Sequence, residues 1–174
     1  VRVEDSMGRD FQCEVTTLRK DGGYTDGRRP DNVTFGNDIE EDLARRDFTI
    51  NAMAIEPMKK LVGAECPSGK LIDPNGRGVK DLESGILSTV GRAEERIGED
   101  GLRIVRAFRF MDLGKGGLRE FDRELSIAIS SNLSMLSKVS KERIWNELKK
   151  ILSCSNSMRI VESMVKHRIF EEIL

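Results

Sequence analysis

Residues 98–110, with the sequence GEDGLRIVRAFRF, have the periodicity of an amphipathic helix, and they decide how the second half of the chain folds. At about 100° per residue, the apolar side chains fall within an arc of roughly 120°. Those residues are Ile104, Val105, Phe108 and Met111. Three arginines, Arg103, Arg106 and Arg109, follow on the other side. We expect one core face and one face of guanidinium groups, with Glu99 and Asp100 in the first turn.

The spacing of Asp100 and Arg103 brings an acceptor and a planar donor fork side by side. Such a pair suits the edge of a nucleobase, because the acid accepts from an amino group and the arginine donates to a ring nitrogen or carbonyl. Arg106 and Arg109 suit phosphate, which guanidinium binds in bidentate fashion. On spacing alone, a surface ion pair beside solvated arginines is the more ordinary alternative.

A second polar cluster lies in residues 44–54, ARRDFTINAMA, at an expected helix-to-strand junction. Such a junction can point several polar groups into one cleft. Arg46 suits phosphate, Asp47 suits a ribose hydroxyl, and Asn51 can serve either purpose. From composition alone, a charge cluster at the end of a helix with Asn51 in a turn is the simpler interpretation.

The first 35 residues consist of short β-like runs at residues 1–3, 11–19 and 32–35, separated by turn residues. They predict antiparallel strands. Alternation in the second run puts Glu14 on the polar face, where it is a candidate metal ligand, although most strand glutamates simply face solvent. The intervening loop at 22–30, GGYTDGRRP, is Gly-rich and basic, and such hairpin loops are commonly mobile turns.

The rest of the pattern divides the chain into two parts. Residues 38–46 predict a short helix, 48–57 an apolar β-rich stretch, and 67–78 a connector rich in Gly and Pro. Beyond Arg92 the periodicity is helical, with interruptions at 114–117, 130–134 and 153–157. We expect an α+β unit at 1–80 and an α-helical unit at 81–174.

Composition limits the possible chemistry. The 174 residues carry a net charge of −1, so contact with nucleic acid must be local. His167 is the only histidine, which disfavours histidine-based catalysis, and three distant cysteines disfavour a zinc knuckle or disulfide framework. The sequence has neither a membrane-length apolar run nor a signal peptide, so a cytoplasmic or organelle-matrix location fits best. Because the chain begins at Val1 in an apparent strand, we expect it to be a fragment.

Six segments taken in order resemble the class II tRNA nucleotidyltransferases, which are CCA-adding enzymes, and the related bacterial poly(A) polymerases. They are EVTTLR at 14–19, YTDGRRP at 24–30, EEDLARRDFTINAMA at 40–54, DPNGRGVKDL at 73–82, EDGLRIVRAFRF at 99–110 and VSKERIWNELKKIL at 139–152. The resemblance implies the remnant of a polymerase-β-like nucleotidyltransferase head, with antiparallel strands plus helices, followed by an all-α neck. In domain terms, residues 1–80 are the head and 81–174 the neck.

The implied activity is template-independent addition of CMP and AMP, from CTP and ATP, to the 3′ end of tRNA by two-metal catalysis with magnesium. In the family two aspartates on an early head strand hold the metal. No such Asp-x-Asp pair precedes Glu14 here, so we expect this chain alone to be inactive. Glu14 matches a third catalytic carboxylate. We expect no membrane association, and no protein partner is indicated.

The resemblance also implies residue roles. Arg46 and Asp47 would contact phosphate and ribose, and Asp100 with Arg103 would form an amino-acid template for the incoming base. Arg106 and Arg109 match further nucleotide-contacting positions, and residues 141–152 match a helix that supports the template. The 24–30 segment resembles a flexible loop that helps switch between CTP and ATP, and its candidate residues are Tyr24, Asp26, Arg28 and Arg29.

Three departures from the family pattern stand out. Gly101 replaces a proline, which removes a rigid first-turn φ. The 73–82 motif has one residue more than the family motif, and the 58–74 linker is longer than a tight hairpin. The alternatives are a bacterial poly(A) polymerase, a CC-adding or A-adding specialist, and a noncatalytic RNA-binding protein that kept this scaffold; the NAMA ending at 51–54 favours CCA addition.

Overall fold

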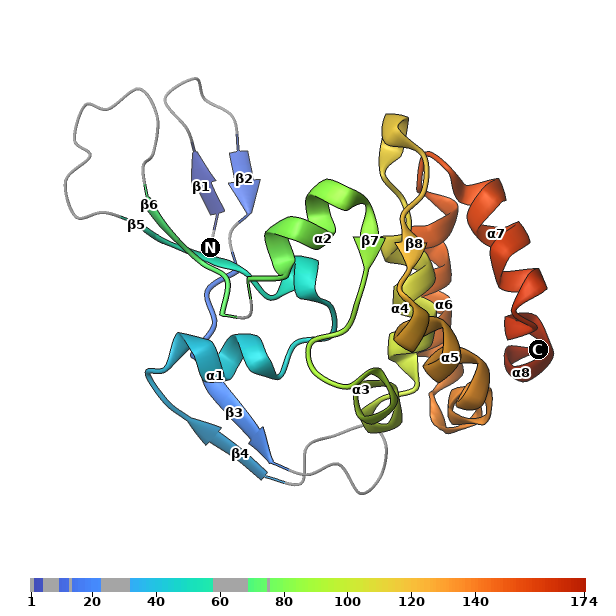
Figure 1. Ribbon diagram of the computed structural model, residues 1–174, viewed down its shortest axis with the longest axis horizontal. Coiled ribbons are helices and arrows are strands. Elements are labelled where there is room, and N and C mark those ends of the chain that lie inside the picture. The colour runs from blue at the N-terminus through green and yellow to red at the C-terminus, as the bar shows by residue number, and fades with distance from the viewer. Residues whose placement is uncertain (1, 5–9, 13, 23–31, 58–68, 75) are drawn as a thin grey trace.

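The computed structural model describes residues 2–4, 10–12, 14–22, 32–57, 69–74 and 76–174. Strand pairs gather toward one end of the molecule and helices toward the other (Figure 1). Three of the pairs are antiparallel: β1 (Arg2–Glu4) with β2 (Asp10–Gln12), β3 (Arg19–Gly22) with β4 (Asn32–Phe35), and β5 (Ala54–Pro57) with β6 (Gly69–Ile72). The predicted α+β class is confirmed.

The helices are short and mostly follow one another closely. The α-helices are α1 (Ile39–Ala44), α2 (Gly78–Ser84), α3 (Ala93–Glu99), α4 (Leu102–Phe110), α5 (Arg123–Ser131), α6 (Lys141–Leu152), α7 (Ser157–Lys166) and α8 (Ile169–Ile173). The 3-10 turns are η1 (Thr49–Asn51), η2 (Gly114–Gly116) and η3 (Leu133–Lys138). The helix expected within 38–46 and the break at 153–157 are both confirmed.

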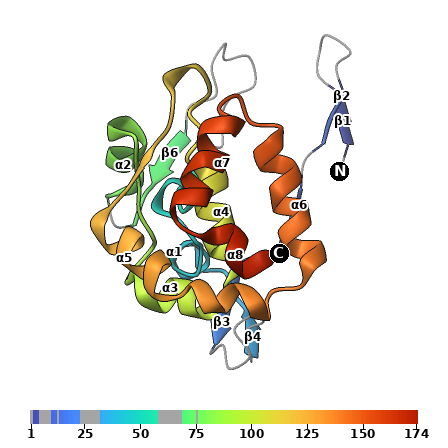
Figure 2. The same cartoon turned by 90° about the vertical axis from the view of Figure 1, so that its right-hand side faces the viewer.

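Helix α4 lies at the centre of the main hydrophobic core. Its apolar arc is fully buried, with Ile104, Val105 and Phe108 each 0% exposed. Helices α6 and α7 contact it, and with α8 they form the face seen in Figure 2. The predicted core face of residues 98–110 is therefore confirmed.

The start of this helix differs from the expectation. Helix α3 ends at Glu99, Asp100 is extended with φ −154°, and α4 begins only at Leu102. The break has a local cause, because the Asp100 Oδ1 accepts the Leu102 backbone N–H at 3.0 Å and so caps the new helix. The placement of Glu99 and Asp100 in the first turn of one helix was wrong.

Helix α4 also ends earlier than expected, at Phe110 rather than at the interruption predicted for residues 114–117. Arg119 Nη1 donates to the carbonyl oxygens of Phe110 and Asp112, at 2.8 and 3.0 Å, and so satisfies groups that a longer helix would use. The chain then turns through η2 and enters β8 (Glu120–Phe121), which pairs in parallel with β7 (Ile86–Leu87). The neck region is consequently not all-α.

Two expectations about strands were wrong. Residues 14–18 form no strand, and those from Glu14 to Thr17 are exposed, because no described strand pairs with this segment. Conversely, the 67–78 connector contains β6, whose Leu71 and Ile72 lie opposite Ile55 and Ala54. Pairing with a partner strand thus outweighs local Gly and Pro content.

The division at residues 80/81 stays a prediction, and the core crosses it. Phe48 is 0% exposed and belongs to the same cluster as the neck residues Ile104 and Phe108. Arg77 adds a polar link, since its Nη2 donates to Ser88 Oγ at 2.9 Å and to Asp122 at 3.3 Å. The two parts therefore share one interior.

Some expectations fall outside the described residues. These are the loop candidates Tyr24, Asp26, Arg28 and Arg29, and the cysteines Cys13 and Cys66. Cys154 is a half-buried free thiol. Within the described ranges, no helix is long and apolar enough to cross a membrane.

Candidate functional site

A cleft of about 610 Å³ brings the two polar motifs together, and its volume is within the usual range for small-molecule sites. Its lining comes from the 14–18 segment, the end of α1, η1, α4 and α6. The lining residues are Glu14, Thr16, Arg45, Arg46, Asp47, Asn51, Asp100, Leu102, Arg103, Arg106, Phe110 and Arg143. Every predicted site residue within the described ranges lines this cleft except Arg109.

The charge of the cleft differs from that of the whole chain. Five arginines face three carboxylates in its lining, whereas the chain carries a net charge of −1. A concave surface with excess guanidinium attracts an anion of phosphate type. Two acids outside the lining offset part of this positive charge, because Asp42 pairs with Arg45 and Arg46 and Glu99 pairs with Arg103.

Asp47 joins the two motifs. It is 8% exposed, and its Oδ1 accepts the Phe48 backbone N–H at 2.9 Å and the Asn51 amide at 3.3 Å. Its Oδ2 accepts a hydrogen bond of 2.7 Å from Nε of Arg106, which lies on α4. The junction between α1 and η1 is thereby fixed to the arginine face of the central helix.

Arg46 is the most exposed arginine of the cleft, with 43% of its side chain accessible. Its Nη2 lies 3.1 Å from Asp42 Oδ2, and its Nη1 donates to the Asn51 carbonyl oxygen at 3.3 Å. These two contacts leave other N–H groups of the guanidinium able to bind a ligand.

Asp100 and Arg103 both line the cleft, but they bond to other partners. Asp100 receives Arg143 from α6, with Nη2–Oδ2 2.7 Å and Nη1–Oδ1 3.3 Å. The break before α4 is what frees the Asp100 side chain to meet α6. Among the described residues, the side chains of Asp100 and Arg103 form no ion pair with each other, whether as the expected base-reading pair or as the alternative surface pair.

The Arg103 side chain is buried rather than displayed, at 8% exposure for the residue. It donates to Glu99 and to the carbonyl oxygens of Arg96 and Arg45, at 2.7 and 3.4 Å. The expectation that all three arginines project from an open face was wrong, because α3 folds back beside α4 and surrounds Arg103 with acceptors.

Arg109 lies beneath the cleft. Its Nε is 2.7 Å from Glu147 Oε2, and its guanidinium carbon stands 4.0 Å from the centre of the Phe110 ring. Glu147 is 4% exposed and also receives Lys150 at 2.8 Å. Contact between Arg109 and a nucleotide stays a prediction.

Sequence reasoning missed several residues of the site. Arg45, Thr16, Leu102, Phe110 and Arg143 line the cleft, and the buried acids Asp42 and Glu147 hold its arginines. The i,i+4 spacing of Arg143 and Glu147 in the 139–152 motif was the available signal. Apart from Lys150 on α6 itself, their partners lie in or just before α4, so spacing within one helix does not reveal them.

The described residues do not form a magnesium site. Across the described ranges, no group of three or more His, Cys, Asp or Glu side chains has metal-binding geometry. Glu14 lines the cleft as an exposed residue of an irregular segment. Its role as a metal carboxylate stays a prediction.

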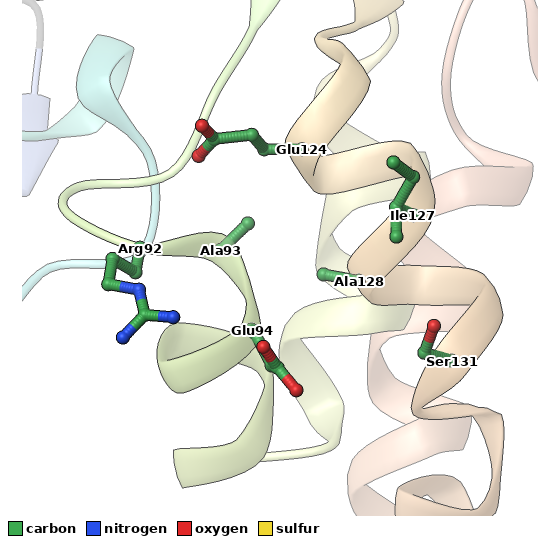
Figure 3. A pocket seen from close by; sticks show the side chains of 7 residues that line it. All are labelled: Arg92, Ala93, Glu94, Glu124, Ile127, Ala128 and Ser131. Carbon is green, nitrogen blue, oxygen red and sulfur yellow. The ribbon is translucent and has the colours of Figure 1, made fainter.

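A second cleft of about 310 Å³ lies between α3 and α5 and shares no lining residue with the first (Figure 3). Ala93, Ile127 and Ala128 form its apolar part, with Glu94 and Glu124 nearby (Figure 3). None of the predicted site residues contributes to it.

Two family models match the chain. Residues 2–88 match the poly A polymerase head domain, and residues 120–174 match the probable RNA and SrmB-binding site of polymerase A. The chain belongs to the poly A polymerase head-domain family. The order of the two matches along the chain agrees with the head and neck that the motifs imply.

Relatives within this family are CCA-adding enzymes. The enzyme of Lactobacillus johnsonii is 41% identical over 92% of this chain, and that of Bacillus subtilis is 40% identical over 96%. The chain spans only 37% and 38% of the lengths of these relatives.

Solved structures of CCA-adding enzymes are also similar to this chain. The CCA-adding enzyme of Bacillus stearothermophilus in complex with CTP has a TM-score of 0.73 and 34% identity, over 97% of this chain and 36% of that one. The Thermotoga maritima enzyme complexed with tRNA has a TM-score of 0.60 and 33% identity, over 77% of this chain and 30% of that one.

Proposed function

We propose that this chain is the nucleotide-selecting part of an RNA nucleotidyltransferase that adds CMP and AMP, from CTP and ATP, to the 3′ end of tRNA. The observation that carries the proposal is the arginine-rich cleft, which gathers residues of both long motifs from distant parts of the sequence. The relatives are bacterial, so we propose the cytoplasm as its location.

In this proposal the cleft binds the nucleotide in three zones. Arg46 and Arg106 contact the triphosphate, since both line the cleft and retain N–H donors beyond those already used. Asp47 and Asn51, at the junction between α1 and η1, form hydrogen bonds with the ribose hydroxyls. Asp100 and Arg103 read the base edge, which requires each to exchange a present partner for the base.

Two-metal transfer is the chemistry that the family resemblance implies, with one ion activating the primer hydroxyl and one stabilising pyrophosphate. The donor set of the described residues does not fit a magnesium site, so the role we assign to this chain is to hold and select the nucleotide. We propose that Glu14 is the one carboxylate that this chain contributes to metal binding.

CCA addition is favoured over poly(A) addition because the similar relatives and solved structures are CCA-adding enzymes. A noncatalytic RNA-binding protein is the alternative of another class. It predicts an intact fold and cleft without nucleotide transfer, so a transfer assay separates the two.

The test is a chimera in which this chain replaces the matching segment of the Bacillus subtilis enzyme, to which it aligns over 168 residues. We expect the chimera to add two CMP and one AMP to tRNA lacking its CCA end, as resolved by gel with labelled CTP or ATP. Arg103→Ala in the chimera is the matched control and should reduce transfer.

Two results would contradict the proposal. A folded chimera that binds CTP but transfers neither nucleotide would favour the noncatalytic alternative. Long AMP tracts without CMP addition would favour a poly(A) polymerase.

A further inference from the structure

Asp42 is a buried carboxylate that lies behind the cleft and is not part of its lining. It sits on α1 and is 2% exposed, which is costly for a charge unless it is well paired. Four N–H groups surround it: the Arg19 backbone N–H at 3.2 Å, Arg45 Nε at 3.1 Å and Nη2, and Arg46 Nη2 at 3.1 Å.

The ionised form of Asp42 is the one that these contacts stabilise. Burial raises its pKa, but the hydrogen bonds from Arg45, Arg46 and Arg19 outweigh burial and hold the pKa below its ordinary value. A charged carboxylate therefore faces the arginines at neutral pH.

The two oxygens of Asp42 have separate partners. Oδ1 binds the Arg19 backbone and Arg45, and Arg45 Nε also donates to the Arg19 carbonyl oxygen at 3.0 Å. Oδ2 binds Arg46. Oδ1 thus attaches strand β3 to α1 and also holds Arg45 of the cleft lining, whereas, among the described residues, Oδ2 binds only Arg46, the more exposed cleft arginine.

Arg46 needs such a partner to be held in place. Its side chain is long and 43% exposed, and an unrestrained arginine occupies many rotamers. The Asp42 Oδ2 and the Asn51 carbonyl oxygen bind its two terminal nitrogens from the protein side. Its unused N–H groups are left for an anion in the cleft.

We propose that Asp42 is a positioning residue whose buried carboxylate orients the Arg46 guanidinium toward the triphosphate of the bound nucleotide. This inference rests on the proposed function, because it requires the cleft to bind CTP or ATP. If Asp42 served only to attach β3 to α1, its loss would lower stability without a specific effect on triphosphate binding.

The sign of the charge change separates positioning from simple electrostatics. Asp42→Asn removes a negative charge near an anion site, so Coulomb's law alone predicts tighter CTP binding. Loss of orientation predicts weaker binding. Cytidine lacks phosphates, so its affinity reports on folding and on the base and ribose contacts only.

The experiment measures CTP and cytidine affinities by calorimetry for the wild-type chain, Asp42→Asn, Arg46→Ala and the double variant. We expect Asp42→Asn to weaken CTP binding about tenfold relative to cytidine, as loss of a charged hydrogen bond would. The double variant should bind CTP no more weakly than Arg46→Ala alone. Glu40→Gln makes the same charge change at an exposed position of the same helix and should leave both affinities unchanged.

Equal losses for CTP and cytidine, or additive losses in the double variant, would overturn the positioning role. Asp42→Glu is the second variant if Asp42→Asn does not fold, because it keeps the charge but displaces the carboxylate; it should show the same CTP-specific loss, and equal losses would again overturn the role. Absence of CTP binding by the wild-type chain would instead contradict the proposed function.

Discussion

Single residues set the geometry at the start of α4. Gly101 stands between Asp100 and the helix, and its α-carbon faces the backbone of η3. A Cβ at this position would clash with the Met135 carbonyl oxygen and lie 2.7 Å from the carbonyl carbon. The departure from proline therefore coincides with close packing of η3 against the start of α4.

Gly101→Ala should destabilise the chain by about 1–3 kcal/mol, because backbone rather than a flexible side chain must move. The measurement is the free energy of unfolding from urea titration. Gly98→Ala is the matched control: a Cβ there meets nothing within 4 Å, and alanine favours the helix by about 0.5–1 kcal/mol. Equal effects of the two substitutions would contradict this packing argument.

The sequence pointed to the candidate residues in the two long motifs, but it did not predict which residues they contact. Spacing on α4 predicted the buried arc, and the family resemblance assigned residues of both motifs to one nucleotide. The pairing of Asp100 with Arg143 spans 43 positions and depends on the break at Gly101, so helical periodicity gives no sign of it. Arg103 appeared solvated for the same reason, since its acceptors come from α3 and α1.

At the scale of elements, hydrogen bonds from turns hold the neck helices in register. Asp112 follows α4, and its carboxylate accepts the Asn156 amide at 2.7 Å and the backbone N–H groups of Gly114 and Ser155 at 3.2 Å. The Asn156 amide also donates to the carbonyl oxygens of Gly114 and Gly117. The turn between α6 and α7 is thereby attached to the loop after α4.

This attachment should depend on pH. Burial raises the pKa of Asp112, but the hydrogen bonds from Asn156, Gly114 and Ser155 lower it below its ordinary value of 3.8. Since the pKa is lower in the folded state, the stabilisation is complete above the unfolded value and is lost as pH falls through the folded value. Asp112→Asn should therefore reduce the loss of stability below about pH 4.

Urea unfolding of both proteins from about pH 6 to pH 2.5 tests this expectation. The difference between wild type and Asp112→Asn should shrink as the wild type acidifies. A constant difference across the range would show that Asp112 does not contribute through its charge.

At the scale of the whole molecule, the cleft depends on the packing of the head against the neck. Asp47 binds Arg106 across this contact, and Phe48 beside it enters the neck core with 0% exposure. The β-like runs and the helical periodicity predicted two units, but the pairing of β7 with β8 within 81–174 was not foreseen. The shared core was not predictable, because one buried aromatic residue looks the same whether its partners are local or distant.

The central claim is that this cleft selects CTP and ATP through Asp100 and Arg103. Cytosine and adenine present an amino donor beside a ring-nitrogen acceptor, whereas uracil and guanine present a carbonyl acceptor beside a ring N–H donor. A carboxylate paired with a guanidinium therefore fits the first two bases and is mismatched to the others.

The most direct test is the affinity of the purified chain for the four nucleoside triphosphates, compared with Asp100→Ala and with the exposed control Lys149→Ala. We predict that the wild type and Lys149→Ala bind CTP and ATP about tenfold or more tightly than UTP and GTP, and that Asp100→Ala loses most of this preference. Equal binding of all four by the wild type, or an unchanged preference in Asp100→Ala, would contradict the account.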